Sequence, residues 1–97
     1  MLAASRYLLS ASAYLPGAAA VGVEQRIRSA FEDRLPDSNP SVHVALTDVV
    51  TVEFTLAAAT LADARAVGRS VAEGVLLGAS PVALDAVELL VPPVVPV

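Results

Sequence analysis

Apolar and polar residues alternate along two stretches of the chain, residues 7–15 and 50–58. In the first stretch every odd-numbered position is apolar, whereas the even-numbered positions include two serines. Because successive side chains of a strand point to opposite faces, a period of two predicts β-strands with one face on a core. The alanine content leaves a helix as the alternative for residues 7–15.

Two other stretches have the periodicity of helices. Over residues 18–35 the apolar residues are spaced so that they form one stripe of a helix, namely Ala20, Val23, Ile27, Ala30 and Phe31. Pro36 is expected to end this helix. Over residues 60–77 the predicted stripe is Ala64, Val67, Val71 and Val75. Thr60 is the expected N-cap, with Asp63 three residues later as a capping-box variant, and Gly78 is the expected C-cap.

The second predicted helix contains two interior glycines, Gly68 and Gly74. Glycine costs about 1 kcal/mol relative to alanine in a helix interior. We therefore expect this helix to approach the sheet or the other helix closely.

Residues 41–46 and 86–91 complete the set of predicted strands. The valines of residues 41–46 must share a face with Val50, Val52 and Phe54, since a slip of one residue inverts the faces of a strand. A three-residue loop over residues 47–49 satisfies this parity, with Asp48 as the residue that tolerates a left-handed conformation. This register places His43 directly opposite Glu53.

The resulting element order, βαββαβ, predicts an α+β ferredoxin-like sandwich. We expect a four-stranded antiparallel sheet, in the order 4-1-3-2, with two helices on one face. Residues 1–91 form a single domain in this prediction, and residues 92–97 are a Pro/Val-rich tail. The tail is either a free end or a segment laid along a groove of its own sheet or of a neighbour.

The composition narrows the classes of partner. Of the 97 residues, 56% are hydrophobic, above the usual ~45–50%. This excess reflects either an alanine-rich composition or apolar surface buried against another copy or a partner protein. The net charge is −4, there is no lysine and the arginines form no stripe, which argues against nucleic acids and acidic membranes as partners.

The residue types also argue against several kinds of site. Without cysteine and with one histidine, the chain has no thiolate chemistry and no multi-histidine metal site, and we expect no cofactor. No stretch reaches the ~18–20 unbroken apolar residues of a membrane span. A signal peptide over the first twenty residues is the alternative to a cytoplasmic protein, but Ser10, Ser12 and Pro16 interrupt its apolar run.

The face of the predicted sheet turned away from the helices carries the candidate functional residues, namely Tyr14, Ser10, Ser12, His43 and Glu53. A carboxylate beside an imidazole can create a base, although such cross-strand pairs are ordinary on exposed sheets. We therefore expect a non-enzymatic interaction module, acting as a homo-oligomer or as a subunit of a larger complex. The alternatives are a regulatory small-molecule-binding domain or small cofactor-free enzyme using this face, and a structural component of a virion or secretion apparatus.

Overall fold

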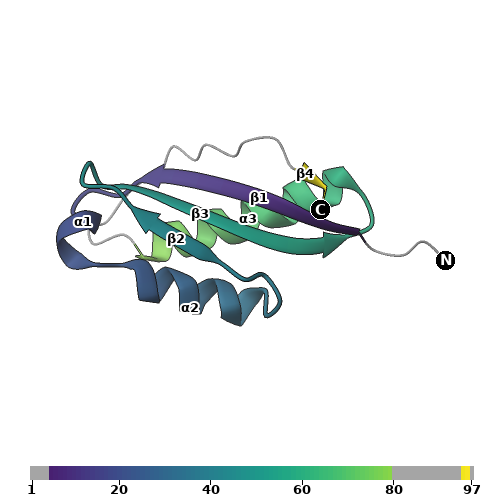
Figure 1. Ribbon diagram of the computed structural model, residues 1–97, viewed down its shortest axis with the longest axis horizontal. Coiled ribbons are helices and arrows are strands. Elements are labelled where there is room, and N and C mark those ends of the chain that lie inside the picture. Colours follow the sequence, from purple (N-terminus) through teal and green to yellow (C-terminus); the bar gives the residue numbers. More distant parts are fainter. Residues whose placement is uncertain (1–4, 80–94, 97) are drawn as a thin grey trace.

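The computed structural model describes residues 5–79 and 95–96 (Figure 1). The chain forms an α+β fold whose elements are, in order, β1 (Ser5–Tyr14), α1 (Ala18–Val21), α2 (Glu24–Arg34), β2 (Ser41–Val44), β3 (Val49–Ala58), α3 (Leu61–Ala79) and β4 (Val95–Pro96).

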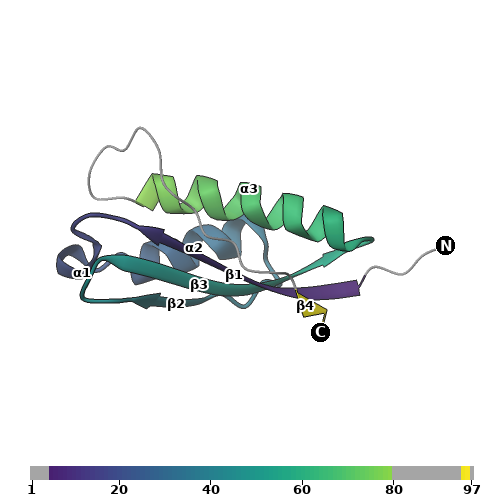
Figure 2. The same cartoon turned by 90° about the horizontal axis from the view of Figure 1, so that it is seen from above.

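The sheet is built on β1 and β3, which pair antiparallel over all ten residues of each strand, from Ser5 opposite Ala58 to Tyr14 opposite Val49. Helices α2 and α3 lie on the same side of this sheet (Figure 2). The odd-numbered side chains of β1 from Tyr7 to Ala13 and the even-numbered side chains of β3 from Val50 to Leu56 are buried beneath them, as the alternating pattern predicts. The rings of Phe31 on α2 and Phe54 on β3 meet in this core, with their centroids 4.7 Å apart.

Most of the buried residues of helix α3 are small, although Val75 and Leu76 are buried with them. Its buried residues are Ala64, Gly68, Ala72, Val75, Leu76 and Ala79. The predicted stripe of Ala64, Val67, Val71 and Val75 is therefore partly wrong, because Val67 is 44% exposed. Where the backbone of α3 lies close to the sheet, glycine and alanine fit between them, and larger side chains such as Val67 lie beside the contact.

The two interior glycines of α3 have the close neighbours that the sequence predicts. A methyl group at Gly68 would collide with the side chain of Leu9 on β1, and one at Gly74 would meet the guanidinium of Arg34 on α2. The Thr60 hydroxyl accepts the Asp63 N–H at 3.1 Å, which confirms the predicted N-cap. The predicted C-cap at Gly78 is wrong, since α3 continues to Ala79.

The predicted single helix over residues 18–35 is two helices. Gly22 has φ 76°, and its N–H donates to the carbonyl oxygen of Ala18, which closes α1 after one turn. A left-handed glycine ends a helix in this way because it has no Cβ to clash with the backbone. Val23, Ile27 and Phe31 are buried as predicted, but Ala20 is exposed.

The predicted four-stranded ferredoxin-like sandwich is wrong. Residues 5–79 form a three-stranded antiparallel sheet, in the order β2-β3-β1, and three helices. Within the described residues, the two-residue strand β4 lies beyond β1 and pairs with Tyr7 and Leu8. The predicted strand over residues 86–91 lies outside the described residues.

Candidate functional site

The open face of the sheet, turned away from α2 and α3, carries short polar side chains in rows that run across the three strands. One row contains Ser41, Glu53 and Ser10, and the next contains His43, Thr51 and Ser12. The hydroxyl groups of Ser12 and Thr51 are hydrogen-bonded at 2.9 Å. The structure thus brings all the predicted site residues to one face, Tyr14 included.

The register of the β2–β3 hairpin differs from the predicted one by two residues. His43 lies opposite Thr51, and Glu53 lies opposite Ser41. The loop has three residues as predicted, but it covers residues 46–48, with Asp48 left-handed at its third position (φ 67°). Three-residue hairpin loops place the left-handed residue last, after a type I turn, and this rule displaces the loop by one position.

This shift separates the predicted acid–base pair. His43 and Glu53 become diagonal neighbours, whose Cα atoms in such a register are about 7–8 Å apart, and no hydrogen bond joins them. The prediction that they lie directly opposite one another is wrong. In the structure the Glu53 carboxylate is therefore not hydrogen-bonded to the His43 imidazole as an acid–base pair requires.

One end of the molecule is held together by Asp48. Its carboxylate accepts the N–H groups of Gly17 and Ala19, each at 2.9 Å, and its carbonyl oxygen accepts the N–H of Leu15. The hydrogen bonds from Gly17 and Ala19 hold the pKa of the Asp48 carboxyl below its ordinary value, because they stabilise the charged form. The hairpin loop is thereby fixed against the segment that joins β1 to α1.

Exposed apolar side chains gather at this same end, where α1 lies beside the β2–β3 loop (Figure 1). Tyr14 and Val49 face each other across β1 and β3 and are 58% and 36% exposed. Leu46 in the loop is 96% exposed, and Val21 on α1 is 57% exposed. We call these four residues the apolar tip. Four of the six large apolar side chains that are exposed in the described chain are thus at this end of the molecule.

The predicted place of Leu46 on the buried face of β2 is wrong, and this error explains why the apolar tip was not foreseen. The alternating pattern assigns Leu46 to the strand together with Val42 and Val44. In the structure β2 ends at Val44, Ala45 closes the hairpin by donating its N–H to the carbonyl oxygen of Val49, and Leu46 is the first residue of the loop. The side chain is consequently left in solvent.

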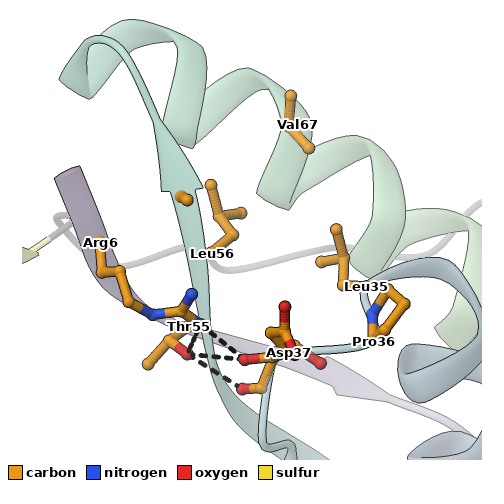
Figure 3. A pocket seen from close by; sticks show the side chains of 9 residues that line it. Arg6, Leu35, Pro36, Asp37, Thr55, Leu56 and Val67 are labelled. Atoms are coloured by element: carbon orange, nitrogen blue, oxygen red, sulfur yellow. Dashed lines mark hydrogen bonds between the residues drawn. The ribbon is translucent and has the colours of Figure 1, made fainter. Parts of the chain in front are cut away.

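A second polar cluster lies at the opposite end of the sheet. One nitrogen of the Arg6 guanidinium, Nη2, donates to the carbonyl oxygen of Asp37 at 2.6 Å and to the Thr55 hydroxyl at 2.8 Å (Figure 3). Thr55 also donates its N–H to the carbonyl oxygen of Ser38. Strand β1, strand β3 and the α2–β2 loop are joined here. Nothing in the sequence singles out Arg6, because the contact depends on where the loop crosses the edge of β3.

Beside this cluster is a cavity of about 170 Å³. Its walls are Arg6, Asp37, Ser38 and Thr55 together with apolar groups from Leu35, Pro36, Leu56, Ala57 and Val67. Arg6 enters from one side and the α2–β2 loop from the other, with Leu56 and Val67 between α3 and β3 (Figure 3). Ser38 is 1% exposed, and its hydroxyl has no hydrogen-bond partner among the described residues.

Residues 5–79 and 95–96 contain neither a metal site nor a membrane-spanning helix. No three histidine or acidic side chains converge there in a way that could hold a metal ion. In the same residues no helix combines the length and apolarity that crossing a membrane requires. The chain matches no protein-family model, no curated protein and no solved structure.

Proposed function

We propose that this protein is an interaction module that associates with a second copy of itself through the open face of the sheet and the apolar tip. The observation that carries the proposal is the exposed cross-strand pair of Tyr14 and Val49, which joins the apolar tip to the open face. Large apolar groups gathered in one patch and bordered by polar side chains are typical of protein contact surfaces.

The polar part of the open face fits a second copy because the charges of His43 and Glu53 complement each other. His43 and Glu53 are diagonal neighbours that do not hydrogen-bond within the chain. A two-fold interface brings the same patch of both copies together, so that residue i meets j and j meets i. A two-fold axis that runs between these residues brings each histidine onto the glutamate of the partner.

The remaining polar groups of the open face are short. Ser12 and Thr51 already satisfy each other, so covering them leaves no hydroxyl of this pair without a partner. Serine and threonine also lose little side-chain freedom when they are covered. The open face can therefore be buried at low cost, and association can be stabilised mainly by the apolar tip.

Leu46→Asp tests the proposal without disturbing the fold, because the Leu46 side chain is 96% exposed. A two-fold interface loses two leucine side chains, each worth about 1.5–3 kcal/mol when fully buried. The dissociation constant should therefore rise roughly a hundredfold or more. Leu61→Asp is the matched control, since Leu61 is 45% exposed at the start of α3 and is not part of the apolar tip.

Sedimentation equilibrium of the wild type and both variants measures the association. We expect dimers for the wild type and Leu61→Asp and monomers for Leu46→Asp at the same concentration. Equal dissociation constants for the two variants would show that the apolar tip is not part of the interface. A monomeric wild type at high concentration would exclude self-association altogether.

A further inference from the structure

We propose that the cavity beside Arg6 binds a small aliphatic α-amino acid as its zwitterion. This site lies at the end of the sheet remote from the apolar tip, and it does not depend on the proposed self-association. The argument rests on the size of the cavity, on its apolar wall and on two opposite charges at its rim.

The size suits a compact aliphatic group. The cavity measures about 170 Å³, and an engineered apolar cavity of about 150 Å³ accepts benzene, a molecule of six carbon atoms. The apolar wall of the cavity is formed by Leu35, which follows α2, by Leu56 on β3 and by Val67 on α3. A branched side chain of four carbon atoms would cover these three residues.

The Arg6 guanidinium has donors to spare for a carboxylate. Arginine carries five N–H donors, and Nη2 uses its two on the Asp37 carbonyl oxygen and on Thr55. The donors on Nε and Nη1 make no hydrogen bond with the described residues. The two bonds from Nη2 hold the guanidinium in place at the cavity, so a carboxylate meets a positioned charge.

The Asp37 carboxylate supplies the opposite charge. Asp37 also lines the cavity, but Arg6 binds its main-chain oxygen, and no ion pair forms between the two side chains. A simple carboxylic acid would meet repulsion from Asp37, and a simple amine would meet repulsion from Arg6. A ligand that carries both a carboxylate and an ammonium group satisfies both charges, and an α-amino acid carries the two groups on one carbon with an aliphatic side chain left for the apolar wall.

The binding test compares leucine with 4-methylpentanoate, which lacks the ammonium group, and with 3-methylbutylamine, which lacks the carboxylate. Each compound is titrated into the full-length protein, and the amide resonances of Thr55, Leu56 and Val67 are followed by NMR. We expect saturable shifts with leucine and binding about tenfold weaker or more for the other two, because each loses a charged hydrogen bond.

Asp37→Asn separates the electrostatic argument from mere hydrophobic binding. The Asp37 carboxylate makes no hydrogen bond with the described residues, so this variant keeps the fold, whereas Arg6→Gln also removes the contact with the loop. We expect Asp37→Asn to bind leucine more weakly and 4-methylpentanoate more tightly than the wild type does. Asp33→Asn, an exposed change on α2 outside the cavity, should leave both affinities unchanged. The proposal is overturned if leucine does not bind, or if leucine and 4-methylpentanoate bind equally in the wild type and in Asp37→Asn.

Discussion

Replacing Gly68 by alanine tests the close approach of α3 to the sheet. The new methyl group would overlap the Leu9 side chain and would lie 3.4 Å from Cδ2 of Leu56. Leu9 is 1% exposed and Leu56 is 4% exposed, so neither side chain can move aside without displacing the core. Gly68→Ala should therefore destabilise the protein even though alanine is the better helix former.

The size of the effect follows from two opposing contributions. Overpacking a buried contact costs about 1–3 kcal/mol, and we expect the upper part of this range because the overlap is severe. The gain in helix propensity from glycine to alanine is about 1 kcal/mol. The net loss in the free energy of unfolding is thus about 1–2 kcal/mol, which lowers the Tm of a domain of this size by about 4–16 °C.

Two other glycines of the same helix provide matched controls. A methyl group at Gly78 meets nothing within 4 Å, so Gly78→Ala should gain up to about 1 kcal/mol. A methyl group at Gly74 meets only the end of the Arg34 side chain, which is exposed and can swing away, so Gly74→Ala should change stability little or raise it. Urea denaturation of the three variants measures these differences. If Gly68→Ala is as stable as Gly78→Ala, α3 does not pack on Leu9 as described.

Three further substitutions have defined expectations. The pKa of Asp48 is lower in the folded protein than in the unfolded chain, so its contribution to stability is complete above the ordinary aspartate pKa, near pH 4. This contribution is lost as the pH falls through the lower pKa of the folded state. Asp48→Asn should therefore weaken the dependence of Tm on pH at acid pH. Ser38→Ala removes a buried hydroxyl without a partner in the described chain and should raise the free energy of unfolding in urea by about 1 kcal/mol. Gly22→Ala forces a side chain into φ 76° and should lower that free energy by about 1 kcal/mol, whereas an unchanged midpoint would contradict the left-handed end of α1.

The sequence predicted correctly those features that depend on local backbone geometry, such as strand faces, a helix cap and a left-handed turn residue. Alternation along β1 and β3 assigns each side chain to the core or to the open face, because a strand has no other periodicity. The same argument placed Tyr14, Ser10 and Ser12 on one face and gave the hairpin the correct parity. Both the N-cap at Thr60 and the left-handed Asp48 followed from local backbone chemistry.

The predictions were wrong for features that depend on how closely separate parts of the chain approach one another. Hydrophobicity favours Val67 over Gly68 for the buried face of α3, yet the short distance to Leu9 admits only the glycine. Parity alone could not distinguish the observed register from one displaced by two residues, and the position of Asp48 within the loop decides between them. The cluster at Arg6 exists because the α2–β2 loop crosses the edge of β3, which no local pattern encodes.

The central claim is that a second copy covers the open face, and the chain allows a direct test because it contains no cysteine. Ser10→Cys places a thiol of nearly the same shape in the middle of the open face, and Ser70→Cys places one on the exposed side of α3. The measurement is the rate of thiol modification as a function of protein concentration. We expect the rate at position 10 to fall as the protein dimerises, while the rate at position 70 stays constant. Rates that do not depend on concentration at either position, up to the highest soluble concentration, would contradict the account.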